Sequence, residues 1–298
     1  MMGGAQAVHN VSGKFVVQLC DEKHRAKVSR HVTDRHAAED APHFEALVRR
    51  HYGNLAKLPA FSISGASSGA VTELLASPEV CGVEAVRVWH ALEDASFPVD
   101  ETALWNLDRI DQTALPLDGV RSTGSYTGAG ASVFILDTGV DMTHSEFANT
   151  GRTAINVASF VEDADWAYNE AWGWYDAPSG GASERLENDV DGHGTHCAGT
   201  CCGATVGVAP QADLYGIKVL DDDGSGSTDW IIDAIDAVAG LVRAGSLDGA
   251  VIVSMSLGGS CPYFDPIDCA TLDSEALAIE SLHALGSQYQ RRWGRLSL

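Results

Sequence analysis

Two residues of this sequence could act together in proton transfer, one as a general base and the other as a carboxylate that orients it. Asp137 directly follows the apolar run Val133–Leu136, so its carboxylate lies at the end of a predicted buried strand, where open α/β sheets place their sites. His193 stands between two glycines, so other backbone can approach its imidazole closely and a helix can begin at once. An imidazole titrates at about pH 6.5 and suits proton transfer near neutrality once a carboxylate fixes its tautomer. Asp137 and His193 are therefore the candidate catalytic residues.

The same region also offers metal-ligating side chains, and we do not expect a metal there. His193, His196 and Cys197 are three soft ligands, but no fourth ligand has a suitable spacing. The two histidines also diverge by about 60° around a helix. A calcium-loop pattern that begins at Asp221 fails, because Ile232 stands where the bidentate Glu is needed.

A serine in the first part of the chain fits a nucleophile pattern. Ser67 lies in Gly65-Ala-Ser-Ser-Gly69, which has the Gly-x-Ser-x-Gly form of an α/β-hydrolase elbow and precedes Asp137 and His193 in the hydrolase order. Only about two strands precede Ser67, which is too few for the sheet that such an elbow needs. The α/β-hydrolase interpretation is therefore not favoured.

Four segments together resemble the subtilisin-like serine proteases (peptidase S8), above all the proteinase K group. They are Ile-Leu-Asp-Thr-Gly-Val around Asp137, Gly-His-Gly-Thr-His-Cys-Ala-Gly-Thr around His193, and residues 218–226 and 253–259. Trp105–Ile110 resembles the start of the mature enzyme of that group, and residues 14–93 resemble its inhibitor I9-type propeptide. The resemblance covers roughly residues 14–286.

The resemblance implies roles for particular residues of this chain. Asp137 would orient His193, which would take the proton of a serine that attacks the scissile peptide bond. Cys197 matches the cysteine that the proteinase K group carries beneath its histidine. Two strand-like segments would pair with the backbone of an extended substrate. The implied substrate-binding residues are Gly224, Ser225, Gly226, Ser256, Leu257 and Gly258.

The third member of the triad is not found in this sequence. In the family, an oxyanion-hole Asn and a Gly-Thr-Ser-Met-Ala type box follow downstream, but here the helix candidate Ser274–Leu285 ends at Gly286 and leads into a basic tail. We therefore expect a zymogen-form serine endopeptidase that is truncated at its C-terminus and inactive as this chain. The alternative is a non-catalytic, propeptide-like protease inhibitor or an interaction protein.

The patterns predict two regions of different architecture. In the first, residues 14–20, 58–64 and 83–92 read as strands, Phe44, Leu47, Val48 and Tyr52 recur at helical spacing, and a short helix ends before Pro78. These elements predict a small α+β unit, a sheet covered on one face. The resemblance to the I9-type propeptide implies that this unit is ferredoxin-like.

Beyond the first region, buried strands alternate with longer helices. Strands are expected at Ser132–Leu136, Leu214–Leu220 and Ala250–Leu257, with a helix along residues 231–242 between the last two. This βαβ order predicts an α/β domain with a mostly parallel sheet flanked by helices. The resemblance implies that it is a partial subtilisin-like sheet. The expected organisation is an unstructured start (1–13), a propeptide domain (14–95), a linker (96–104), the N-terminal part of a catalytic domain (105–286, with a surface insertion at 161–189) and an atypical basic tail (287–298).

Composition excludes several classes of function. The 298 residues are 45% hydrophobic and 20% charged, as in a folded globular protein, and no apolar run approaches the roughly 18 to 20 residues of a membrane span. Residues 1–95 hold 10 basic and 11 acidic residues, which leaves 9 basic and 30 acidic for residues 96–298, so the net charges are −1 and −21. An acidic field of this size repels phosphate backbones, so no nucleic-acid partner is expected.

The remaining expectations concern partners and location. We expect polypeptide substrates, the propeptide as an intramolecular inhibitor, no membrane and a monomeric state. The resemblance implies no catalytic cofactor, and structural calcium as in the family but without an assignable ligand set. It also implies an extracellular protein, although residues 1–12 lack the basic and apolar regions of a secretory signal. Seven cysteines are too few and too scattered for a disulfide scaffold, but Cys261 and Cys269 could close a short loop.

Overall fold

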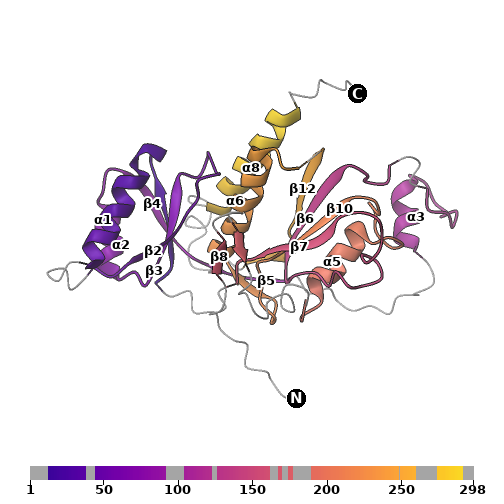
Figure 1. Cartoon of the computed structure of the whole chain (residues 1–298), viewed down its shortest axis with the longest axis horizontal. Helices are drawn as coiled ribbons and strands as arrows, with labels where there is room; N and C mark the ends of the chain where they lie inside the picture. The colour runs from indigo at the N-terminus through magenta and orange to yellow at the C-terminus, as the bar shows by residue number, and fades with distance from the viewer. Residues whose placement is uncertain are drawn as a thin grey trace, which may run out of the picture. The chain divides into compact units, whose positions relative to one another are not determined.

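The computed structural model describes residues 13–37, 44–91, 104–122, 126–161, 167–169, 174–176, 189–247, 249–259 and 274–290. Its contacts divide the chain into two compact units. Unit 1 comprises Met1–Trp89, Ser225–Ser246 and Gly259–Leu298, and unit 2 comprises His90–Gly224 and Leu247–Gly258. Figure 1 labels their helices and strands. No helix within the described ranges is long and apolar enough to cross a membrane.

The first part of unit 1 is a four-stranded antiparallel sheet with two helices. Its elements are β1 (Phe15–Leu19), η1 (Glu22–His24), α1 (Arg25–Ala37), β2 (Leu47–His51), β3 (Ala60–Ser64), α2 (Ser68–Leu75) and β4 (Val80–Ala85). The strand order is β2-β3-β1-β4, and neighbouring strands run antiparallel. This βαββαβ order is the ferredoxin-like arrangement that the resemblance implies.

One face of this sheet carries an apolar core. Val17 of β1 and Phe61 of β3 point to this face and are buried. Val28 and Val32, one turn apart on α1, pack against them together with Leu74 of α2. Figure 1 shows both helices on this side of the sheet.

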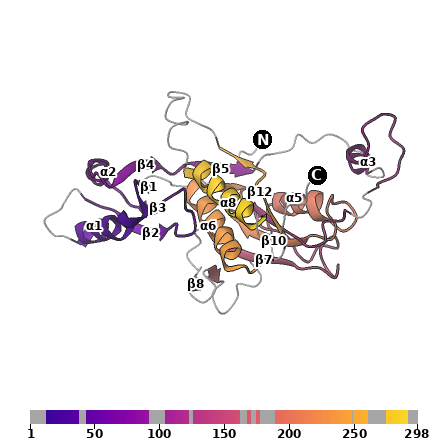
Figure 2. The same cartoon turned by 90° about the horizontal axis from the view of Figure 1, so that it is seen from above.

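The opposite face of the same sheet is covered as well, which the sequence analysis does not anticipate. Gln18 alternates with Val17, and its Nε2 donates to Ser274 Oγ at 2.8 Å. Ser274 begins α8 (Ser274–Gln290), which lies beside α6 (Thr228–Ala244) in both views of Figures 1 and 2. The four-stranded sheet of unit 1 is therefore a layer between two pairs of helices.

The helix predicted around residues 44–52 is wrong. Residues Leu47–His51 form β2, in which Leu47 is 49% exposed and exposed residues alternate with partly buried ones. The helix lies earlier, at α1, where only Val28 and Val32 are buried. With two apolar residues on an otherwise polar helix, the hydrophobic period of α1 is too weak to be detected.

The two longer helices of unit 1 agree with the sequence patterns in position, but not at every end. α6 ends at Ala244, and Gly245 adopts a left-handed φ of 67°, a common C-terminal cap. α8 begins at Ser274 as expected but continues past Gly286 to Gln290, so the predicted end at Gly286 is wrong.

Unit 2 is built on a parallel sheet. Its strands are β6 (Ala131–Asp137), β7 (Ala154–Ser159), β10 (Asp213–Lys218) and β12 (Ala250–Ser254), in the order β12-β6-β10-β7. Every neighbouring pair is parallel, which confirms the predicted α/β class. Helix α5 (His193–Cys202) packs against β6 and β10 through Ala198 and Cys202, which bury against Val133 and Leu214.

Several further expectations can be compared with the described residues. Trp105–Asp111 forms α3. Ser67 is the N-cap of α2, with its Oγ accepting from the Ala70 N–H at 3.2 Å, so the local structure gives this serine a capping role. Within the predicted insertion, the strands β8 (Ala167–Asn169) and β9 (Trp174–Asp176) form an antiparallel pair. Residues 92–103 of the linker region and Cys261 and Cys269 lie outside the described residues.

Candidate active site

The carboxyl end of β6 fixes the backbone of Asp137. Its carbonyl oxygen accepts from the N–H groups of Val219 and Leu220, which follow the neighbouring strand β10. The side chain is completely buried, and its Oδ1 accepts from the Thr138 N–H at 2.7 Å. The same Oδ1 lies 2.7 Å from His193 Nδ1. The two candidate catalytic residues are therefore at hydrogen-bond distance, as carboxylate and imidazole.

Glycines allow helix α5 to begin this close to β6. A Cβ on Gly194 would lie 2.0 Å from the Gly139 carbonyl oxygen and 3.1 Å from the Asp137 Cβ. Gly192, just before the helix, has a left-handed φ of 93°. A larger residue at position 194 would push α5, and with it His193, away from the carboxylate.

Asp189 connects the start of α5 to the residue that follows Asp137. Its Oδ1 accepts from Thr138 Oγ1 at 2.7 Å and from the Gly192 N–H at 3.0 Å. Its Oδ2 accepts from both the backbone N–H and the hydroxyl of Thr195, at 2.8 and 2.6 Å. Thr138 Oγ1 in turn accepts from the Gly194 N–H at 2.9 Å. This network satisfies N–H groups of the first turn of α5 and holds it against β6.

Burial dominates the electrostatics of the pair. Removal from water raises the pKa of Asp137, and the hydrogen bonds from His193 and Thr138 oppose that rise. The Oδ2 atom of Asp137 is buried and accepts no hydrogen bond from the described residues. The His193 ring is therefore the main group that favours the ionised carboxylate, and the carboxylate in turn favours the tautomer with a proton on Nδ1. In that tautomer, Nε2 is the ring nitrogen that carries no proton.

Cys197 adds a sulfur to the surroundings of the imidazole. Its Sγ is 3.9 Å from both ring nitrogens of His193. Asp137, His193 and Cys197 are the residues whose candidate metal-ligand atoms lie within 4.8 Å of one another among the described part of the chain. The 2.7 Å between Asp137 Oδ1 and His193 Nδ1 is a hydrogen-bond distance, so a hydrogen bond accounts for this contact.

The expected substrate-binding residues of unit 2 lie along a short antiparallel pairing. Leu257 and Gly258 form β13 and pair with Ala91 and His90, the last two residues of β5 (Val88–Ala91). The Ala91 N–H also donates to the Gly224 carbonyl at 2.8 Å. The remaining expected positions are Ser256, which precedes β13, and Ser225 and Gly226, which begin β11 (Ser225–Ser227) in unit 1.

Comparison with known proteins decides the family. Residues 128–289, more than half of the chain, match the subtilase family of peptidase S8. The chain belongs to the subtilase family. The "Extracellular serine proteinase" of Thermus sp. (strain Rt41A) is 36% identical over 73% of this chain and 44% of its own length. The "Alkaline serine exoprotease A" of Vibrio alginolyticus is 34% identical over 74% of this chain and 39% of its own length.

This subtilase chain thus spans about two fifths of the length of the curated relatives that it matches. A solved structure described as "Crystal structure of a cold adapted subtilisin-like serine proteinase" is 31% identical, with a TM-score of 0.43, over 61% of this chain and 54% of that chain.

The sequence reasoning missed Asp189, which it placed at the end of a surface insertion. A usable signal is present, because an acidic residue a few positions before a helix start is a common way to satisfy its first N–H groups. The disulfide between Cys20 and Cys81 was missed as well. No sequence signal identifies that pair, because 61 residues separate the two cysteines and only the fold brings them together.

Proposed function

We propose that this chain carries the aspartate and the histidine of the catalytic triad of a serine endopeptidase of the proteinase K group. The observation that supports this most directly is the buried Asp137 carboxylate 2.7 Å from His193 Nδ1 at the end of a parallel strand. In the proposed mechanism, Asp137 holds the Nδ1–H tautomer, and Nε2 of His193 takes the hydroxyl proton of a serine during attack on the peptide carbonyl. The imidazolium then gives this proton to the leaving amine. These transfers need no catalytic metal or cofactor.

Polypeptide substrates would bind as an added strand. Leu257 and Gly258 offer a strand edge, and Gly224 offers a backbone carbonyl. The pairing of His90 and Ala91 with these groups supports this role, because an extended substrate backbone could make the same hydrogen bonds. Gly224 has a left-handed φ of 72°, which favours glycine, and a Cβ there would be only in ordinary contact with Ala91, at 3.5 Å.

The first region, residues 14–95, would be an inhibitory propeptide of the I9 type, and the protein a zymogen. Its ferredoxin-like sheet is held to α6 by polar contacts. Arg50 Nε lies 3.2 Å from Asp233 Oδ1, and the Asn54 N–H donates to Asp236 Oδ1 at 2.7 Å. Both aspartates are buried. If β5 occupies the place of a substrate strand beside β13, the proposed propeptide would prevent a substrate from binding there.

The Cys20–Cys81 disulfide supports an extracellular location, because disulfides persist in oxidising compartments. The relatives from Thermus and Vibrio, named an extracellular proteinase and an exoprotease, are in keeping with it. Structural calcium stays an expectation from the resemblance. The non-catalytic alternative is not favoured, since the pair of Asp137 and His193 would then serve no purpose.

The proposal is tested by adding a segment that carries the nucleophilic serine. The Gly-Thr-Ser box of the family is not among these 298 residues, so the chain by itself should hydrolyse no peptide and take no fluorophosphonate label. A chimaera of residues 1–290, which end with α8, and the part of the Thermus proteinase that follows its matched region should hydrolyse peptides. Asp137→Ala and His193→Ala should each lower its kcat at least roughly a hundredfold. Turnover that survives His193→Ala would refute the proposed general base.

A further inference from the structure

A cavity of about 580 Å³ lies between helix α1 and the edge strand β2 of the ferredoxin-like part. Ser29 and Thr33, one turn apart on α1, line it together with Arg30. Val48 and His51 line it from β2. Residues three apart in a regular strand point to opposite faces, but the pairing of β2 with β3 shifts its register after Val48. This bulge lets both side chains reach the same cavity.

Positive charges outnumber negative ones around this cavity. The cations that line it are Lys23, Arg25 and Arg30. Glu22 is the acidic residue among the described lining residues, and it contacts the Arg25 guanidinium. Lys23 pairs with Asp21 at the surface, whereas Arg30 is exposed and makes no hydrogen bond or ion pair with the rest of the described chain. Arg30 thus gives the cavity a positive charge that the described chain does not neutralise.

Arg25 brings further donors to the cavity from a less exposed position. Its side chain is 13% exposed, and its Nη2 donates to the Tyr52 carbonyl oxygen at 2.9 Å. Its Nε is buried and donates to no acceptor among the described residues. Because a buried N–H group of a charged side chain is costly to leave without an acceptor, a ligand that supplies one gains affinity.

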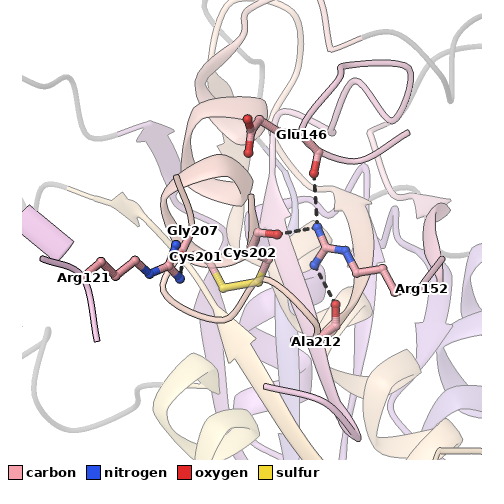
Figure 3. The surroundings of a disulfide bond; sticks show 7 residues. All are labelled: Arg121, Glu146, Arg152, Cys201, Cys202, Gly207 and Ala212. Atoms are coloured by element: carbon pink, nitrogen blue, oxygen red, sulfur yellow. Dashed lines mark hydrogen bonds between the residues drawn. A yellow bond between two sulfur atoms is a disulfide. The ribbon is translucent and has the colours of Figure 1, made fainter. Parts of the chain in front are cut away.

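An arginine with a structural role elsewhere in the chain shows the contrast. Figure 3, drawn around the disulfide between Cys201 and Cys202, shows the Arg152 guanidinium among backbone carbonyl oxygens. It donates to those of three residues, Glu146, Cys202 and Ala212. The chain itself supplies the acceptors of Arg152, whereas at the cavity it leaves arginine donors for another molecule.

We propose that this cavity binds an oxyanion of the sulfate and phosphate class. Such an anion offers several acceptor oxygens at once, which suits the planar donor arrays of Arg25 and Arg30. Ser29 also lines the cavity, and its hydroxyl can add a neutral donor. The cavity is much larger than one such ion, so the anion can also be a group on a larger molecule. The site involves neither Asp137 nor His193 and does not rest on the proposed protease function.

A bound anion acts on His51, because the imidazole lines the same cavity. Without the anion, the partial removal of the ring from water and the charge of Arg25 lower the pKa of His51, while Glu22 acts in the opposite direction. A doubly charged anion beside the ring favours the protonated imidazole and so raises this pKa. By linkage, the protonated ring binds the anion more tightly than the neutral one. The anion therefore restores stability that protonation of His51 removes.

Sulfate is the probe, because it keeps its charge throughout the range in which histidine titrates. The histidine ring signals of the full 298-residue chain are followed by NMR from about pH 8 to 5, in sodium sulfate and in sodium chloride of the same ionic strength. The signal of His51 is the one that His51→Gln lacks. Millimolar sulfate should raise the pKa of His51 by about half a unit or more, and the effect should saturate. The same pKa in both salts would overturn the proposal.

Two matched variants show whether the cavity is the site. Arg30→Gln removes an exposed side chain without partners in the described chain, so the fold should persist, while the concentration of sulfate that gives half of the shift should rise at least about threefold. Lys27→Gln removes the same charge from the same helix. Lys27 is 70% exposed, contacts Glu79 and does not line the cavity, so its loss should leave the sulfate dependence unchanged. Equal sulfate dependence in the two variants would refute the cavity as the site.

Dextran sulfate distinguishes a free ion from a sulfate group on a polymer. It is compared with sodium sulfate at equal concentrations of sulfate groups and equal ionic strength. A shift of the His51 signal at a lower concentration than with the free ion would identify the polymer as the better ligand, and a shift at the same or a higher concentration would identify the free ion. A shift with dextran sulfate that Arg30→Gln leaves unchanged would place polymer binding outside the cavity and contradict the proposal for that source.

Discussion

Four hydrogen bonds converge on the Asp189 carboxylate, and their donors lie on both sides of the candidate catalytic pair. Thr138 follows Asp137, while Gly192 and Thr195 bracket His193. A change in Asp189 therefore alters how closely α5 approaches β6, and loss of its charge removes one influence that raises the pKa of Asp137. Asp189 is a positioning residue, since it acts through the elements that carry Asp137 and His193.

We predict that Asp189→Ala lowers the free energy of unfolding by about 2 to 3 kcal/mol, because it removes four acceptor contacts and leaves the Thr138 hydroxyl without its acceptor. Urea denaturation of the full chain measures the loss. The matched control is Asp191→Ala, whose carboxylate accepts from the His193 N–H at an exposed position and should cost less than about 1 kcal/mol. Equal losses in the two variants would contradict the positioning role.

At the scale of residues, the sequence indicates the pair but not its support. Asp137 and His193 stand out because their neighbours are unusual: an apolar run before one, and glycines on both sides of the other. Asp189 and Thr195 have ordinary neighbours, and their role depends on the approach of α5 to β6, which only the fold defines. The catalytic role of the pair itself stays a prediction.

At the scale of elements, patterns succeed where an element is buried on most sides and fail where it is mainly polar. β6 has six consecutive buried residues, and α6 buries most of its length, so both are predicted near their observed bounds. α1 buries only two valines, and β2 alternates between exposed and partly buried residues, so the helix was expected at the wrong place. The weaker the contrast between buried and exposed positions, the less the hydrophobic period can distinguish helix from strand.

The Cys20–Cys81 disulfide joins the end of β1 to β4, at a Cα separation of 4.9 Å. Because it closes a loop of about 60 residues, its loss should lower the free energy of unfolding of the ferredoxin-like part by about 2 to 4 kcal/mol. Hydrogen exchange of the β1 and β4 amides in a Cys20→Ser, Cys81→Ser double variant measures this locally. Dithiothreitol should speed the same exchange in the parent and leave the double variant as it is. A parent that does not respond to the reductant would show that the bond contributes nothing.

At the scale of the whole molecule, the acidic excess lies after residue 95, and part of it is placed inside unit 1. Asp233 and Asp236 of α6 face Arg50 and Asn54 of the ferredoxin-like part. Burial raises the pKa of Asp236, and the hydrogen bonds from Asn54 oppose this rise. Carboxylates buried this deeply need their polar partners. The ferredoxin-like part of unit 1 and helix α6 should therefore stabilise each other.

Arg50→Ala tests that dependence. Removing the guanidinium from Asp233, where both side chains are 13% exposed, should lower the free energy of unfolding by about 2 to 3 kcal/mol. Adding Asp233→Asn should recover part of the loss, since no buried charge then needs a partner. Lys57→Ala is the surface control, because the pair of Lys57 and Glu280 is 51% and 60% exposed and should contribute less than about 1 kcal/mol. If Arg50→Ala and Lys57→Ala have the same effect, the Arg50–Asp233 contact does not join the two parts.

His51 gives unit 1 a dependence on pH. It lies at a cavity of about 580 Å³, with its ring 5.7 Å from that of Phe61. His51 is an exposed residue of β2, and the partial removal of its ring from water, with the charge of Arg25, lowers its pKa, while Glu22 acts in the opposite direction. The other charged groups around the cavity are Lys23 and Arg30. The folded state therefore favours the neutral imidazole more than the unfolded chain does.

The sign of the effect follows from this lowered pKa. The stabilisation is fully present above the unfolded-state pKa of about 6.5, and it decreases as the pH falls through that value towards the lower pKa of the folded state. The melting temperature of the 298-residue chain should therefore fall between about pH 7.5 and 5.5, a window above the ordinary pKa of carboxyl groups. His51→Gln should flatten this slope, while His36→Gln, on the exposed end of α1, should leave it unchanged. Parallel slopes in the parent and His51→Gln would show that His51 has no part in the response to pH.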